Sequence, residues 1–339
     1  MVEEKNKRIL FFANVYMGYE KLIEQEMRSM GYEVDVFDER SVKKSYEKAL
    51  IKISPNIFKF KTEKYYKDII EKVKLRQYDI VFFVKCDMPT QKVMEDLKST
   101  FPKAKFCLYM WDSICNIPNI KSKFKYFDYI NTFDRKDSEN EKIGFRPLFY
   151  AKEYEKKANS NKEYQYDFCF IGTIHSERFK LLQTIKELAK KMNRTTFFYM
   201  YLQKKYVFYF YKLVKRDFFK ADIKDFKFQK IDSDMISDII EKSKVIIDAQ
   251  HPRQTGMTMR TIEMIGMKKK LITTNKDIAN YDFYRPSNIC IIDKNEIRID
   301  QDFLECPYEE LPDSVYAKYS LHQWMLDVLG IEDKTPLNS

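Results

Sequence analysis

Residues 245–275, VIIDAQHPRQTGMTMRTIEMIGMKKKLITTN, are the most informative part of the chain. Its apolar residues 245–248 and 271–274 predict two strands, and the apolar spacing between them predicts a helix that carries Arg260 and Glu263. A polar loop ending near Gly256 precedes this helix, so its first N–H groups are available to an anion. Many enzymes hold a nucleotide diphosphate with such a strand, loop, helix and strand in their second domain.

Outward from this stretch, strand and helix patterns alternate along the whole chain, which predicts parallel sheets with helical crossovers. The polar segment AKEYEKKANSNKEYQY, residues 151–166, predicts a linker between two halves. We therefore expect an α/β protein with two Rossmann-like doubly wound domains that face a central cleft. The expected parts are residues 1–155, residues 165–310, and a C-terminal helix in residues 311–339 that packs back on the first domain.

Composition limits the classes of function. Hydrophobic residues make up 44% of the 339 and aromatic residues 16%, which argues against disorder. No apolar run reaches the roughly 18 residues of a membrane span, and the N-terminus lacks a signal-peptide pattern, so we expect a cytoplasmic protein. The six Cys form no C-x-x-C pair and indicate neither zinc nor disulfides. The net charge of +10 suggests an anionic partner, but no nucleic-acid-binding motif is present, so nucleic acid is not expected.

Three segments carry a resemblance: FCFIGTIHSERF at residues 168–179, the opening stretch, and NYDFYRP at residues 280–286. Together with the two-domain pattern they resemble the GT-B type of glycosyltransferase, and more narrowly the CgeB-like group of capsule and lipopolysaccharide biosynthesis proteins. YMWDS and NTFDRKD in the first half match in outline. The resemblance implies a nucleoside-diphosphate sugar held mainly by the second domain and a glycan or lipid-linked glycan acceptor held mainly by the first.

The resemblance also implies roles in the opening stretch. Many retaining GT-B enzymes carry two Glu eight positions apart, and the second falls on Glu263, where it would accept hydrogen bonds from ribose hydroxyls. The first position is Thr255, which has no carboxylate, so the sugar contact and the retaining or inverting outcome stay open. Arg260 would clamp the diphosphate or pair with Glu263. The alternative is a solvated Glu263 with Arg260 as its i,i+3 partner.

Other candidates for donor binding lie at the ends of predicted strands. Gly172 and Thr173 predict a phosphate-facing turn, because a glycine there lets backbone N–H groups approach an anion. His175 and Arg178 follow at the start of the next helix, and His251 and Gln254 precede Gly256. The simpler alternatives are an ordinary turn and a loop histidine without a role.

Acceptor-side candidates lie in the first domain. Asp112 follows a predicted strand and is a possible general base, and Trp111 would stack on a sugar. The alternative is that Asp112 caps the next turn while Trp111 lies in the core. The first strand–helix turn contributes Asn14, Tyr16 and Gly18.

Neither of the two Asp-x-Asp patterns is interpreted as a metal site: Asp232 is expected to cap a helix, and Asp300 lies in a polar tail region. We therefore expect a metal-independent glycosyltransferase without a bound cofactor, in which cationic side chains and helix N-termini stabilise the leaving diphosphate. The alternative is a non-catalytic GT-B-like scaffold that binds a nucleotide or a glycan.

The segment from Gln203 to Lys220 mixes Tyr and Phe with Lys and Arg. Such belts suit the interface of a bilayer, and one hypothesis is that the segment docks on the inner face of the membrane. The alternative is a buried strand followed by a core helix with lysines that reach back to solvent.

Overall fold

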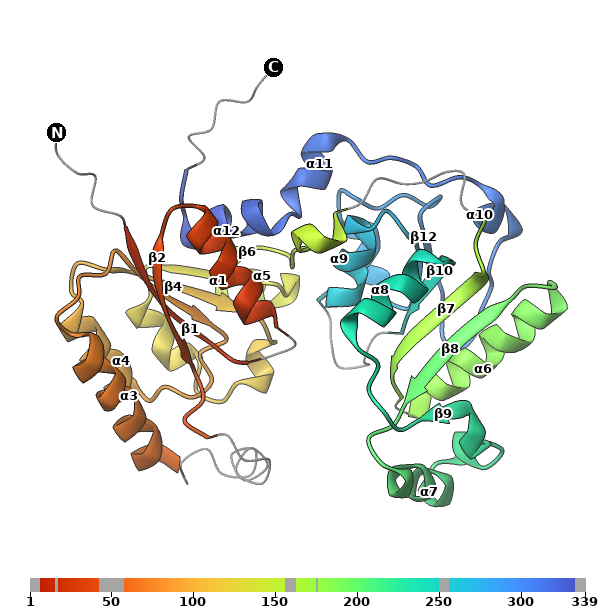
Figure 1. The fold of residues 1–339 in the computed structure, drawn as a ribbon, viewed down its shortest axis with the longest axis horizontal. Helices are drawn as coiled ribbons and strands as arrows, with labels where there is room; N and C mark the ends of the chain where they lie inside the picture. The colour runs from red at the N-terminus through yellow and green to blue at the C-terminus, as the bar shows by residue number, and fades with distance from the viewer. Residues whose placement is uncertain are drawn as a thin grey trace. The chain divides into compact units, whose positions relative to one another are not determined.

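The computed structural model describes residues 7–15, 18–42, 58–155, 163–174, 176–249 and 256–332. These residues form two compact units, each built around its own six-stranded parallel sheet (Figure 1). Unit 1 comprises Met1–Ala151 and Lys318–Ser339, and unit 2 comprises Lys152–Ala317. The predicted α/β class with two doubly wound sheets is confirmed.

In unit 1 the strands lie in the order β2-β1-β3-β4-β5-β6. The chain adds β2 on one side of β1 and then crosses back to place β3 on the other. Open parallel sheets bind ligands beyond the carboxyl ends of their strands at such a reversal point, which here lies between β1 and β3. The strands are β1 (Arg8–Ala13), β2 (Glu33–Asp38), β3 (Ile80–Val84), β4 (Lys105–Met110), β5 (Tyr129–Thr132) and β6 (Gly144–Phe145).

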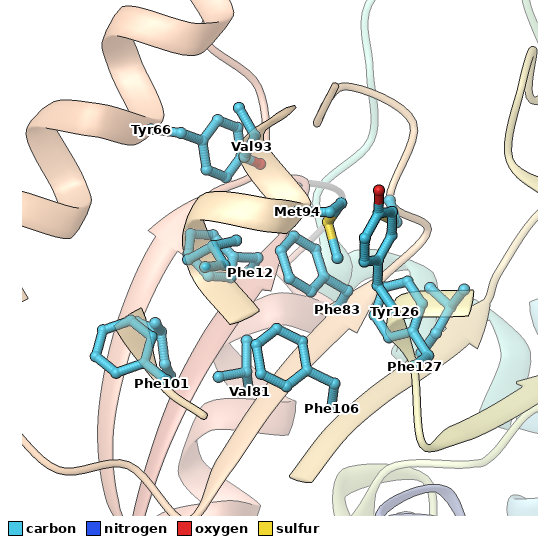
Figure 2. Close-up of a cluster of buried hydrophobic side chains, with 14 of the residues drawn as sticks. Phe12, Tyr66, Val81, Phe83, Val93, Met94, Phe101, Phe106, Tyr126 and Phe127 are labelled. Carbon is cyan, nitrogen blue, oxygen red and sulfur yellow. The ribbon is translucent and has the colours of Figure 1, made fainter. Parts of the chain in front are cut away.

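Both faces of this sheet are covered, which explains the nearly continuous apolar runs of its central strands. On one face, Leu10 and Phe12 pack with side chains from α3 (Lys59–Val73) and α4 (Gln91–Thr100). Figure 2 shows Phe12 gathered in this cluster with residues of neighbouring strands and helices. The opposite face meets α1 (Tyr19–Ser29) and α12 (Leu321–Leu329), and a shorter helix, α5 (Arg135–Glu141), follows β5.

The C-terminal segment divides into two helices where the sequence predicted one within residues 311–339. The break follows α11 (Asp313–Lys318), because Tyr319 and Ser320 leave the helical path to pair with the strand-like residue Tyr150. The N–H of Tyr150 donates to the Tyr319 oxygen at 2.9 Å, and the N–H of Leu321 donates to the Tyr150 oxygen at 3.0 Å. Helix α12 then packs on α1, β4 and β5 of unit 1.

In unit 2 the strands lie in the order β12-β11-β10-β7-β8-β9, and every pair is parallel. The chain here builds β7, β8 and β9 in one direction and then returns to place β10 beside β7, so the reversal point lies between β7 and β10. The strands are β7 (Tyr166–Thr173), β8 (Thr196–Tyr201), β9 (Phe226–Lys227), β10 (Ser243–Asp248), β11 (Lys270–Thr273) and β12 (Ile289–Ile291).

Helices again cover both faces of the second sheet (Figure 1). Residues of α6 pack with Phe168 of β7 and Val245 of β10 in one cluster, while α8 and α9 contact the sheet through β10 and β11. The helices are α6 (Ser176–Lys191), α7 (Lys205–Val214), α8 (Ser233–Glu241), α9 (Met259–Gly266) and α10 (Gln301–Glu305).

One local prediction in unit 2 is wrong. The sequence placed a turn at Gly172 and Thr173, but both residues belong to β7, where they pair with Met200 and Tyr201 of β8. A Cβ at position 172 would lie 3.1 Å from the ring of Phe170, so the glycine makes room for a neighbouring side chain in the strand. The turn toward α6 begins at Ile174.

Among the helices of the described ranges, none has the length and apolarity needed to cross a membrane.

Candidate functional site

At the carboxyl edge of the unit 2 sheet, Arg178 joins the two strands that flank the reversal point. Its Nε donates to the Ala249 oxygen at 2.6 Å, just beyond β10, and its Nη1 donates to the Thr173 oxygen at 3.0 Å, at the end of β7. Burial lowers the pKa of Arg178, and the carboxylate of Asp248 opposes that shift. Two of its five N–H donors therefore hold the edge together, which limits what a bound diphosphate would receive from this side chain.

Asp248 ends β10 at the same edge and fixes the start of α9. Its side chain is 6% exposed, and its Oδ2 accepts hydrogen bonds from the hydroxyls of Thr258 at 2.6 Å and Thr261 at 2.7 Å. Thr258 is also the N-cap of α9, since its hydroxyl accepts from the N–H of Thr261. The aspartate thus sets where α9 begins relative to the strand, and sequence analysis missed it. A carboxylate that ends the apolar run VIID was the available signal.

Glu263, the predicted ribose contact, lies in the middle of α9 and is 7% exposed. The hydroxyl of Tyr154 donates to its carboxylate; burial of Tyr154 and the charge of Glu263 both raise the tyrosine pKa, while the nearby cation Arg260 lowers it. The alternative of a solvated Glu263 is wrong, because the side chain is buried. Tyr154 was also missed, since it stands in the polar segment interpreted as a linker.

Asn275 follows β11 and adds a further polar group to this edge. Thr273 of β11 pairs with Asp248 of β10, and Asn275 comes two residues later with 5% of its surface exposed. Its Oδ1 accepts from the N–H of Asp277 at 3.0 Å, while its Nδ2 is buried and has no hydrogen-bond partner within the described residues. A buried amide donor without a partner is costly, and a ligand oxygen would satisfy it.

The other donor-binding candidates divide into two groups. Gly256 is buried ahead of α9, and Gly172 and Thr173 lie at the end of β7. The second group lies outside the described residues and so stays a prediction: His175, His251, Gln254 and Thr255.

On the acceptor side, Asp112 follows β4 in unit 1 and already accepts three donors. Lys85 Nζ lies 2.9 Å from Oδ2, and Oδ1 accepts from the Ser113 N–H at 3.0 Å and from Asn116 Nδ2 at 2.9 Å. Both carboxyl oxygens of Asp112 are therefore engaged by donors of the protein itself. To act as a general base, Asp112 would have to part from Lys85.

Trp111 takes part in an aromatic cluster rather than standing alone. Its ring lies 5.6 Å from those of Tyr19 and Phe149 and 6.3 Å from that of Trp324, and it is partly exposed. Of the remaining candidates, Gly18 precedes α1 with a φ of 86°, a value that favours glycine. Asn14 follows β1, its Oδ1 buried without a hydrogen-bond partner in the described ranges, and Tyr16 lies outside those ranges.

A buried carboxylate, which sequence analysis missed, shapes the exit of β3 at the reversal point of unit 1. Lys85 and Cys86 have φ values of 86° and 57°, which are strained for residues with a Cβ. Glu39 is fully buried, and its carboxyl oxygens accept from the N–H groups of Cys86 at 3.0 Å and Met88 at 2.9 Å. These bonds hold the strained turn from which Lys85 reaches Asp112.

The carboxyl group of Glu39 interacts with that of Asp87, and the two pKa values shift in opposite directions. Burial first, and then the charge of Asp87, raise the pKa of Glu39. Burial alone would raise the pKa of Asp87 too, but the hydrogen bond from Glu39 and the cations Lys85 and Arg40 outweigh it and lower that pKa. Of the two carboxyl groups, Glu39 is therefore the one whose protonated form the folded state favours.

The raised pKa of Glu39 makes the stability of unit 1 depend on pH. Above the ordinary glutamate pKa of 4.5, the folded state holds a proton that the unfolded chain releases, so the free energy of unfolding falls as pH rises through the folded pKa. Glu39→Gln should flatten that slope, at a cost of about 1–2 kcal/mol for the lost acceptor. Urea unfolding from pH 5 to 8 measures both, with Glu24→Gln as the surface control. Equal slopes in wild type and Glu39→Gln would contradict the assignment.

The two Asp-x-Asp patterns have structural roles. Asp232 caps α8 by accepting from the N–H of Met235, and Asp300 caps α10 by accepting from that of Asp302. The interpretation of Asp232 as a helix cap is confirmed. Within the described ranges, no group of three or more His, Cys, Asp or Glu side chains is placed to hold a metal ion.

Solved structures share this fold along the whole chain. A glycosyltransferase from Rickettsia africae ESF-5 has a TM-score of 0.62 at 17% identity, over 99% of this chain and 100% of that one. An alpha-glucosyltransferase in complex with UDP and a 13-mer DNA has a TM-score of 0.55 at 14% identity, over 97% of both chains. Anabaena Alr3699/HepE in complex with UDP and glucose has a TM-score of 0.56 at 9% identity, over 95% of this chain and 99% of that one.

No protein-family model and no curated protein matches the sequence. At identities this low, the likeness establishes the fold. The chain has the two-sheet fold of the GT-B glycosyltransferases, as the sequence predicted.

Proposed function

We propose that this protein is a glycosyltransferase that moves a sugar from a nucleoside diphosphate to a hydroxyl of a surface-polysaccharide acceptor. The observation that carries the proposal is Glu263, a carboxylate buried in α9 on a sheet of Rossmann order. Two of the similar structures, the alpha-glucosyltransferase and Alr3699/HepE, are complexes with UDP. We do not favour a non-catalytic scaffold, because two of the similar structures, the Rickettsia africae protein and the alpha-glucosyltransferase, are glycosyltransferases.

In the proposed reaction the acceptor hydroxyl oxygen attacks the anomeric carbon, the bond from that carbon to the diphosphate oxygen breaks, and the hydroxyl proton passes to a base. Glu263 would accept from the ribose hydroxyls, and Arg260 with the first N–H groups of α9 would face the diphosphate. The leaving charge would be stabilised by these groups and by His175 without a metal ion. Asp112 is the base we propose, once it is released from Lys85.

The narrower identity is also a proposal. NYDFYRP, one of the segments resembling the CgeB-like group, forms the turn that leads to β12: Tyr281 stacks on Phe283 at 5.2 Å, and Arg285 Nη1 donates to the Asp282 and Tyr284 oxygens. We propose membership of that group, a role in capsule or lipopolysaccharide synthesis, and a cytoplasmic location. Because the motif builds the fold, it supports group membership more than a particular substrate.

Thermal unfolding with UDP, GDP, CDP, TDP and ADP tests the donor. One nucleotide at about 100 times its Kd should stabilise the protein by about 2.7 kcal/mol, or a rise in Tm of roughly 5–10 °C. The matching nucleotide sugar should then be hydrolysed or transferred, equally well with EDTA. The proposal fails if none of the five nucleotides raises Tm, or if the one that binds has no sugar conjugate that is turned over.

A further inference from the structure

Helix α7 carries apolar side chains on two different faces. One face packs into unit 2: Phe208 is 2% exposed and lies 5.2 Å, ring to ring, from Phe226, while Tyr211 lies 5.1 Å from Phe218. This face accounts for the attachment of the helix to the core. It does not account for the rest of its aromatic residues.

The opposite face bears an exposed stripe. Tyr206, Tyr209, Phe210 and Leu213 are 70%, 59%, 58% and 80% exposed. Their spacing of three, four and seven positions places them on one side of a helix. Phe219, directly after the 3-10 helix Arg216–Phe218, is 56% exposed and lies close to them in sequence. The alternative of a core helix is therefore wrong for this face.

The charged side chains around the stripe are almost all positive. The segment from Gln203 to Lys220 contains six Lys and Arg residues and one acidic residue, Asp217. All six cations are exposed: Lys204 before the helix, Lys205 and Lys212 within it, and Lys215, Arg216 and Lys220 after it. Scattered exposed apolar residues are ordinary on proteins, but a contiguous stripe bordered by cations marks an interaction surface.

We propose that this stripe docks unit 2 on an anionic lipid bilayer. Tyrosine and phenylalanine side chains with lysines at their edges suit the boundary between headgroups and acyl chains, where the rings enter and the ammonium groups stay with the phosphates. Helix α7 is ten residues long, about 15 Å, so it lies in the plane of the interface. The cations select an anionic surface over a neutral one. This inference is independent of the proposed function, since docking needs no nucleotide.

Vesicle flotation tests the proposal with the full chain. Wild type should float with vesicles containing 30% anionic lipid, bind far less to zwitterionic vesicles, and be released by high salt. The triple variant Tyr209→Ser/Phe210→Ser/Leu213→Ser should lose at least about tenfold in partition coefficient, because those side chains supply the apolar contact. Lys204→Gln/Lys205→Gln should lose about fivefold per charge.

Matched controls separate this surface from general stickiness. Phe60→Ser/Leu75→Ser removes two exposed apolar side chains of unit 1, and Lys190→Gln/Lys191→Gln removes two exposed charges at the end of α6. Both variants should bind vesicles as wild type does. A tryptophan placed at position 210 should be quenched by lipids brominated in the acyl chain, as an inserted ring would be.

Several results would overturn the proposal. These are no binding to anionic vesicles, binding that the triple variant retains, or equal losses in the Phe60→Ser/Leu75→Ser control. Displacement of wild type and the triple variant alike by heparin would assign the binding to charge alone. Nucleotide affinity in solution should be the same in wild type and the triple variant, so failure of docking and failure of donor binding give different results.

Discussion

Replacing Glu263 by glutamine is expected to weaken binding of the nucleoside diphosphate by about 10- to 100-fold. Hydrogen bonds to a charged acceptor are worth about 1.5–3 kcal/mol, and each 1.4 kcal/mol is tenfold in affinity. Glutamine keeps the volume of a side chain that is 7% exposed, so the change removes charge and one acceptor without opening a cavity. Titration calorimetry with the nucleotide found by thermal unfolding measures the effect.

Tyr154→Phe separates a binding role of Glu263 from a structural one. Tyr154 donates to the Glu263 carboxylate, and phenylalanine removes that donor while leaving the carboxylate in place. If Glu263 binds ribose, Tyr154→Phe should change affinity much less than Glu263→Gln does. Equal losses in both variants would mean that Glu263 acts by holding Tyr154, and unchanged affinity in a folded Glu263→Gln protein would remove the donor-site assignment.

Replacing Trp324 by alanine is expected to lower the free energy of unfolding of unit 1 by about 3–5 kcal/mol. Trp324 is fully buried, with its ring 4.7 Å from that of Tyr109 and 4.6 Å from that of Phe149. Removing it leaves a cavity between α12 and the sheet that its neighbours fill only in part. Calorimetry should then separate two transitions, an early one for unit 1 and a later one that bound nucleotide still raises.

Two further variants sharpen this test. Trp324→Phe keeps a ring and removes an indole N–H that is buried without a partner among the described residues, so it should cost clearly less than alanine. Leu75→Ala, at a site that is 94% exposed, should change stability by no more than about 0.5 kcal/mol. If Trp324→Ala lowered both transitions equally, independent unfolding of unit 1 would be ruled out.

The longer strands of both sheets were predictable because buried parallel strands are apolar on both faces, whereas the two-residue strands β6 and β9 were not predicted. The runs at residues 8–12 and 245–248 each mark a strand to within two residues. The end of β7 was not predictable. A glycine after an apolar run usually indicates a turn, but Gly172 lies within the strand and leaves room for the ring of Phe170. Likewise the break before α12 comes from pairing with Tyr150, a contact distant in sequence.

The candidate site was predictable where a motif sits on one element and not where it is assembled from several. Glu263 could be singled out because it lies in a strand–loop–helix pattern. Asp248, Asn275 and Tyr154 have their roles through contacts with residues that only folding brings close. Glu39 likewise accepts from the backbone of a strained turn that begins 46 residues later in the chain. Such partners leave no periodic signal in a single sequence.

Unit 1 is completed by the last part of the chain, since α12 covers the face formed by Phe82, Tyr109 and Phe149. During synthesis the ribosome makes all of unit 2 between the two parts of unit 1, which takes roughly 10–30 s at about 5–20 residues per second. During that interval α12 does not yet cover the aromatic face. The nascent chain is therefore expected to be a substrate for chaperones, and to release them when Trp324 leaves the exit tunnel.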